Sequence, residues 1–161
     1  TRAAALDTAL NVSYQLAGFA AQEGNLAEVV ALVDKAALEG TTPDEIDLLA
    51  QSLIGQGTTK QGDAALTWIN TGRKIARTDV TRAMADYYEG SLAYNQAMSY
   101  LPANNTTAPS KSAAQRAVPV FRRAKALMQG ASAFSAAAEA RRQILSNIDQ
   151  YLEYLQQIAN G

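Results

Sequence analysis

Acidic side chains gather at one point of the sequence, where Asp44, Glu45 and Asp47 stand within four residues. Paired carboxylates can act as a general acid and a general base. The same residues follow Thr42-Pro43, which is a typical start of a helix, and acidic residues are expected in a first turn because they face the positive end of the helix. We favour this structural interpretation over the catalytic one.

The other usual reactive groups are missing, because the 161 residues include neither cysteine nor histidine. Disulfides, thiolate and imidazole metal ligands and the commonest general bases are thereby excluded. The sequence also contains no glycine-rich phosphate loop and no acidic calcium loop. We therefore predict a protein that is not an enzyme, with no catalytic residue, no cofactor and no metal. The lack of cysteine favours export, to a bacterial periplasm or cell surface, and leaves the cytoplasm as the alternative.

Aromatic and basic side chains are the remaining candidates for a binding site. Tyr87, Tyr88, Tyr94 and Tyr100 fall in one predicted helix, with Tyr87 and Tyr94 on one stripe. Packing in the core is the favoured interpretation, and an aromatic shelf for a ligand is the alternative. Basic residues that could hold a carboxylate, a phosphate or an acidic peptide form two groups. These are Arg73, Lys74, Arg77 and Arg82, and then Arg116, Arg122, Arg123 and Lys125.

The charge of the chain is small overall and uneven along its length. The net charge is −1 and the pI about 5.4, which argues against nucleic acid as a partner. Residues 1–72 hold nine acids and three bases, whereas residues 73–161 hold six acids and eleven bases. The two halves are either solvated helix faces or a dipole that orients a partner or a neighbouring copy.

Composition and periodicity predict an all-α protein. Apolar residues make up 48% of the chain and charged residues 18%, which is typical of a globular domain, and no apolar run is long enough to cross a membrane. Gly24 ends one helical pattern and Asn25, with Glu28, starts the next. Pro119 either kinks the sixth helix or marks its first turn. The predicted helices cover residues 3–22, 26–39, 44–54, 63–76, 79–101, 112–129 and 135–159.

The first helices repeat. At an offset of 33 residues, Leu16-Ala17 aligns with Leu49-Ala50 and Gly24 with Gly57, and past the turn Ala36 aligns with Gly72. A helix, a tight glycine turn and a second helix with a period in the low thirties resemble the tetratricopeptide repeat. In that family a large and a small apolar residue let the paired helices pack closely. The resemblance is clear over residues 10–76 and degenerate beyond.

The resemblance implies three antiparallel hairpins, over residues 3–39, 44–76 and 79–129, wound into a superhelix and closed by a capping helix over 135–159. All of these would form one domain, 1–161. The capping helix carries Ile144, Ile148, Leu152 and Leu155 on one stripe. We expect this stripe to cover the third hairpin, and the alternative is a docking surface for another chain. Trp68 is expected to anchor the contact between hairpins.

The function that follows is a non-catalytic interaction module or scaffold that binds another protein or a peptide on its concave face. The resemblance places eight residues of the first helices on that face: Tyr14, Gly18, Gln22, Asp47, Gln51, Arg82, Asp86 and Asn95. The alternative is a structural subunit that self-associates, or packs in a larger complex or filament, through its acidic and basic halves. A helical domain that binds a small molecule is the least favoured hypothesis.

Overall fold

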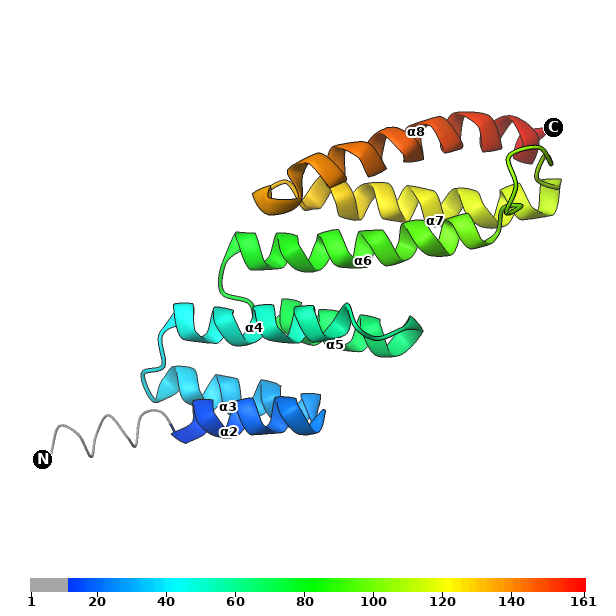
Figure 1. The fold of residues 1–161 in the computed structure, drawn as a ribbon. Coiled ribbons are helices and arrows are strands. Elements are labelled where there is room, and N and C mark those ends of the chain that lie inside the picture. The colour runs from blue at the N-terminus through cyan, green and yellow to red at the C-terminus, as the bar shows by residue number, and fades with distance from the viewer. Residues whose placement is uncertain (1–11) are drawn as a thin grey trace, which may run out of the picture. The chain divides into compact units, whose positions relative to one another are not determined.

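The structure, a computed structural model, describes residues 12–161, and these residues form helices and no strand. The all-α prediction is thereby confirmed. Residues 3–11 of the first predicted helix lie outside the described residues. The order of elements is α2 (Val12–Glu23), α3 (Leu26–Leu38), α4 (Pro43–Gly57), α5 (Gly62–Ile75), α6 (Asp79–Ser99), α7 (Lys111–Gly130), the short 3₁₀ helix η1 (Ser135–Ala137) and α8 (Ala138–Asn160) (Figure 1).

Two compact units make up the chain, the first ending at Ala85 and the second running from Asp86 to Gly161. The first contains α2 to α5 and the start of α6, and the second contains the rest of α6 with α7, η1 and α8. Each unit has a core cluster of its own, so each is described by itself. The single domain and the superhelix remain predictions.

The first turn of the chain forms as its sequence predicts. Gly24 adopts the left-handed conformation, with a φ of 76°, and α2 ends beside it. The Asn25 side chain accepts a hydrogen bond from the Glu28 amide at 3.4 Å and donates one to the Glu28 carboxylate at 2.8 Å. The chain therefore reverses within two residues, because both the turn and the next helix start are stabilised locally.

The start of α4 is equally local. The Thr42 hydroxyl accepts from the Glu45 amide at 3.3 Å, and the Glu45 carboxylate accepts from the Thr42 amide at 2.9 Å. This reciprocal pair is a capping box, and Pro43 occupies the first helical position. The predicted helix start is confirmed.

The second turn differs from the prediction. Gly57 is the last residue of α4 and has no positive φ, whereas Gly62 supplies the left-handed residue with a φ of 56°. Gly57 is needed for another reason: a Cβ there would lie 2.9 Å from Cγ1 of Ile69 and 3.1 Å from the carbonyl oxygen of Ala65. The two aligned glycines thus have different roles: Gly24 provides the left-handed backbone of a turn, whereas Gly57 allows α4 and α5 to pack closely.

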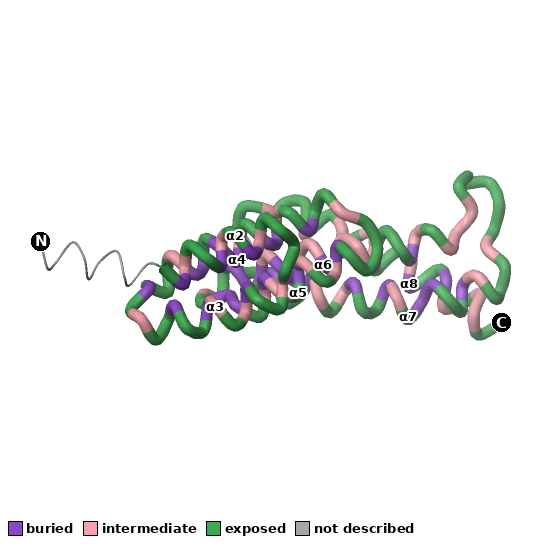
Figure 2. Tube along the Cα trace, turned by 90° about the horizontal axis from the view of Figure 1, so that it is seen from below, coloured by how far each residue is buried: buried purple, intermediate pink, exposed green. Residues whose placement is uncertain are grey.

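The close approach of α4 and α5 continues at Gly72. A Cβ at this position would lie 2.6 Å from Cγ1 of Ile54 and 2.8 Å from the carbonyl oxygen of Ala50. The small residue that the repeat alignment places here, in register with Ala36, is therefore required by the close packing of the two helices. Buried apolar residues from α2 to α5 then form the core of the unit, among them Ala17, Ala20, Val29, Val33, Ile46, Leu49, Ala50, Leu53 and Ile75. In Figure 2 buried and exposed residues alternate along each helix, as expected for helices packed on one side.

The second unit is built from three long helices. Ser110 caps α7 by accepting a hydrogen bond from the Ala113 amide at 3.1 Å. The helix runs through Pro119, which is exposed, so Pro119 does not mark its first turn. Gly90 lets α6 approach α7, because a Cβ there would lie 3.2 Å from Cβ of Leu127.

The apolar stripe of α8 faces this unit. Ile148, Leu152 and Leu155 are buried in one cluster with residues of α6 and α7, and Ile144 packs against it. The prediction that the stripe covers the third pair of helices is confirmed within the second unit. Burial of side chains of this size stabilises a fold by roughly 1.5–3 kcal/mol each. No helix among residues 12–161 is long and apolar enough to cross a membrane.

Candidate functional site

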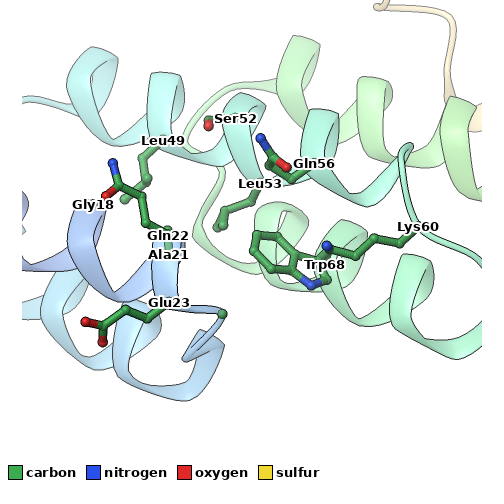
Figure 3. Close-up of a pocket in the computed structure, with 11 residues that line it drawn as sticks. Gly18, Ala21, Gln22, Glu23, Leu49, Ser52, Leu53, Gln56, Lys60 and Trp68 are labelled. Carbon is green, nitrogen blue, oxygen red and sulfur yellow. The ribbon is translucent and has the colours of Figure 1, made fainter.

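The first unit contains a groove of about 580 Å³. Its walls come from the end of α2, from α4, and from the turn and helix that follow α4 (Figure 3). The groove is open to solvent along one side and has an apolar floor with a polar rim. The lining residues are Gly18, Ala21, Gln22, Glu23, Gly24, Leu49, Ser52, Leu53, Gln56, Lys60 and Trp68.

Trp68 forms one wall of this groove. Its ring is half-buried against the core, and Cζ2 lies 3.8 Å from the place that a Cβ on Gly24 would occupy. The Lys60 ammonium lies 4.7 Å from the ring centroid, in a cation–π contact that is visible in Figure 3. Trp68 therefore anchors the contact between the two hairpins, as predicted, and also offers part of its ring to the groove.

The rim combines neutral and charged polar groups. Gln22, Ser52 and Gln56 are exposed, and their amides and hydroxyl can both donate and accept hydrogen bonds. Glu23 and Lys60 add one charge of each sign, and Figure 3 shows them on different sides of the groove. An apolar floor with a few polar groups around it suits a peptide segment that carries an apolar side chain, because the backbone of that segment needs both donors and acceptors.

Two of the eight predicted residues, Gly18 and Gln22, line the groove. Tyr14 lies one turn earlier on α2, and its hydroxyl donates a hydrogen bond to the carbonyl oxygen of Glu45 at 2.9 Å. Burial raises the pKa of Tyr14, and the nearby Glu45 carboxylate adds to the shift. Tyr14 thus joins α2 to α4 beside the groove.

Asp47 and Gln51 form hydrogen bonds with the residues that lead into α6 and with its first turn. Asp47 is only 5% exposed, and its carboxylate accepts from the backbone amides of Arg77 at 2.7 Å and Thr78 at 3.1 Å. Gln51 donates to the Thr81 hydroxyl at 3.1 Å. Burial alone would raise the pKa of Asp47, but the hydrogen bonds from Thr81, Arg77 and Thr78 outweigh it, so the pKa lies below its ordinary value. The structural interpretation of this acidic residue is the one the contacts support.

The other three predicted residues lie on α6. Arg82 pairs with Asp79 at 2.7 Å and donates to the carbonyl oxygen of Ala76 at 3.3 Å. Asp86 and Asn95 belong to the second unit, where Asp86 lies beside Gly130 and Asn95 is exposed. None of the three lines the groove.

Most of the tyrosines and basic residues are engaged in packing or pairing. Tyr87 and Tyr88 surround Phe134, with ring centroids 5.7 and 6.1 Å away, and Tyr94 meets Phe121 at 5.9 Å. These contacts support the packing interpretation of the predicted aromatic stripe. Several basic side chains are paired in the same way, Arg123 with Glu89 at 3.3 Å, Lys125 with Asp149 at 2.7 Å, and Arg116 over the Tyr100 ring at 4.6 Å.

Sequence reasoning missed the α4 and α5 side of the groove. Ser52 and Gln56 lie one turn apart on α4, and Lys60 stands in the turn after it. The prediction placed Asp47 and Gln51 of α4 on the binding face in place of Ser52 and Gln56, and expected Trp68 only to anchor the contact between hairpins. Lys60 lies in a glycine-rich turn, and the only tryptophan of the chain follows eight residues later. This combination was the signal that could have indicated this wall.

Comparison with protein-family models, curated proteins and solved structures finds no significant match. The tetratricopeptide resemblance therefore stands on the residues of the chain alone. Within residues 12–161, acidic side chains do not gather in a group of three that could hold a metal ion.

Proposed function

We propose that this chain is a non-catalytic helical interaction module that binds a segment of another protein in the groove between α2 and α4. The observation that carries the proposal is the combination of the Trp68 face and an apolar floor with a rim of neutral polar groups. Gly18 and Gln22, two residues that the tetratricopeptide resemblance assigns to a binding face, line this groove and support the proposal.

The chemistry of the groove indicates what it would bind. Leu49 and Leu53 belong to the core cluster, so packing holds them in place at the floor of the groove. An apolar side chain of a partner would pack on this floor and on Trp68, and Gln22 and Gln56 would pair with the partner's backbone. A preformed site of this kind loses little conformational entropy on binding.

The proposal can be tested by selecting peptides from a random display library against the whole chain. Binding of a selected peptide is then measured through Trp68, which is the only tryptophan and reports on the groove directly. We expect a change of emission that saturates with peptide concentration. Failure to select any peptide that changes Trp68 emission would argue against a peptide-binding groove.

A pair of glycine variants locates the bound peptide. Gly18 and Gly55 are both helical glycines whose added Cβ would meet nothing within 4 Å, but only Gly18 lines the groove. Gly18→Gln places a side chain in the groove, so we expect affinity to fall about tenfold or more, which is about 1.4 kcal/mol. Gly55→Gln should leave affinity unchanged. Equal effects of the two substitutions would mean that the peptide binds elsewhere.

One observation favours the alternative function, an assembly subunit. Val12, Leu16 and Phe19 form a stripe on α2 and are 45%, 47% and 59% exposed. Exposed apolar stripes of this kind are typical of contacts between proteins. If the stripe joins copies of the chain, sedimentation velocity will show association that grows with concentration, and Phe19→Ser will abolish it without changing the helix content.

A further inference from the structure

A second depression, separate from the groove, lies in the second unit. It encloses about 490 Å³ between the end of α6, the loop that follows it and the last turns of α8. Apolar contacts come from Met98, Leu101 and Pro102, and Tyr151 and Tyr154 line the α8 side. An adjoining depression of about 400 Å³ shares Tyr151, Tyr154 and Asn105 with it. The two form one elongated site, called here the tyrosine channel.

The wall on α8 is a regular row of side chains. Asn147, Gln150, Tyr151 and Tyr154 follow the spacing that places residues on one helix face. Tyr151 stacks on Phe121 with centroids 5.2 Å apart and an interplanar angle of 8°, which holds its ring in place. Tyr154 is 47% exposed, so much of its ring is available to a ligand. From Asn147 to Tyr154 the row is about 10 Å long, from the helical rise per residue.

The opposite wall is a loop ordered by its own hydrogen bonds. The Asn104 side chain accepts from the amides of Thr106 at 3.3 Å and Thr107 at 2.9 Å, and from the Thr106 hydroxyl at 3.1 Å. The next residue, Asn105, is exposed and lines both depressions. The loop therefore presents an amide to the channel from a fixed turn.

The lining of the channel is neutral. None of the described residues that line either depression carries a charge, although 18% of the residues in the chain are charged. Its polar groups are side-chain amides and hydroxyls, and Asn105, Gln150 and Tyr154 are exposed to solvent. A charged ligand would lose its hydration without meeting an opposite charge, so the channel selects against it.

The geometry points to a binding site for a proline-rich segment of another protein in the polyproline II conformation. Proline rings pack on tyrosine faces. Each proline of the bound segment offers a backbone carbonyl as an acceptor and no backbone donor, because proline has no N–H. The donors of Gln150, Asn105 and Tyr154 match those carbonyl groups. A polyproline II segment rises about 3.1 Å per residue, so the row on α8 accommodates about three residues. Aromatic-lined grooves that bind such segments exploit their preformed backbone in the same manner.

Isothermal titration calorimetry of the whole chain with acetylated and amidated hexaproline tests this inference. We expect saturable binding with a Kd below about 1 mM. Because the channel is uncharged, the Kd should be the same within error at about 0.1 M and about 1 M salt. Emission from Trp68, which lines the groove of the first unit, should not change.

Three variants of lining residues and one control variant localise the site. Tyr154→Ala should weaken binding about tenfold, since it removes the exposed ring, whereas Tyr154→Phe keeps the ring, loses only the hydroxyl donor and should weaken binding about threefold. Gln150→Ala should weaken binding about threefold. Gln157→Ala, an exposed amide on the same helix that does not line the channel, is the matched control and should bind as the unmodified chain does. Circular dichroism of each variant confirms its fold.

Several outcomes would overturn the inference. One is the absence of hexaproline binding below about 1 mM, and another is binding that Tyr154→Ala and Gln150→Ala leave unchanged. Binding of maltotriose in place of hexaproline, with the same dependence on Tyr154, would show a sugar site instead. A response of Trp68 emission to hexaproline would place the peptide in the groove of the first unit.

Discussion

The Asp47 carboxylate on α4 accepts a hydrogen bond from the backbone amide of Arg77 at 2.7 Å, across 30 residues of sequence. The same side chain accepts from the Thr78 hydroxyl at 2.7 Å and from the Thr81 hydroxyl, at the start of α6. One buried carboxylate thus fixes the segment through which the chain leaves α5 and enters α6.

Replacement of this carboxylate should destabilise the first unit. Asp47→Asn replaces one of the two carboxylate oxygens by an NH₂ group, which donates and cannot accept. Some of the buried amides and hydroxyls that donate to Asp47 therefore lose their acceptor. We expect a loss of about 1–3 kcal/mol in the free energy of unfolding, measured by urea denaturation. Asp44→Asn, an exposed acid on the same helix, should change stability by about 0.5 kcal/mol or less. Equal losses at the two positions would contradict the assigned role.

The contribution of Asp47 should depend on pH. Its pKa in the folded chain is below the ordinary 3.8, so the folded state favours the ionised form. The stabilisation is therefore fully present above the unfolded pKa and is lost as the pH falls through the folded pKa. The difference in unfolding free energy between the unmodified chain and Asp47→Asn should be constant above about pH 5 and should narrow below about pH 4. A difference in unfolding free energy that widens towards acid pH would show that the pKa of Asp47 is raised, and not lowered, by folding.

Replacing either of two glycines of the second hairpin by alanine should change the stability in opposite directions. Gly72→Ala brings a Cβ within 2.8 Å of the backbone oxygen of Ala50, which cannot move without separating α4 from α5. We expect a loss of about 1–3 kcal/mol. Gly55→Ala adds a methyl group to open space in the last turn of α4 and should stabilise by up to roughly 0.5–1 kcal/mol. Thermal unfolding of both variants checks the pair, and a neutral Gly72→Ala would mean that the two helices are less closely packed.

The turn at Gly24 offers a test of backbone conformation. At a φ of 76° a β-branched residue is strained, so Gly24→Val should lower the unfolding free energy by about 1 kcal/mol or more. Gly24→Asn should cost less, because asparagine tolerates the left-handed region. If valine and asparagine are equally tolerated, then backbone strain at Gly24 does not control the turn.

The last prediction concerns the α8 stripe. Leu155 is fully buried against α6 and α7, so Leu155→Ala should destabilise the second unit by about 2–5 kcal/mol through lost contacts and a cavity. Glu153→Ala lies on the exposed side of α8 and serves as the control. Hydrogen exchange of the α7 and α8 amides measures the effect in that unit alone. Unchanged protection in Leu155→Ala would show that the stripe contributes little to the fold.

Local interactions explain which parts of this structure could be predicted. The Gly24 turn and the Thr42–Glu45 capping box involve residues at most five positions apart, so local side chains and φ preferences determine both features. The periodic apolar stripe of α8 likewise predicts a buried face, because one helix carries all of it. The all-α class follows from such signals, and α3, α4, α5, α6 and α7 each begin within one residue of the predicted start, whereas α8 begins three residues later than predicted.

Long-range packing decided the rest. Gly57 was aligned with a turn glycine, but the approach of Ile69 from α5 is what requires a residue without a side chain. Asp47 was assigned to a binding face, and only the return of the chain at Arg77 and Thr78 buries it. The groove at Trp68 and the tyrosine channel also join residues from separate helices. Periodicity determines which side of one helix is apolar, whereas the neighbour that meets each side depends on how helices distant in the sequence pack together.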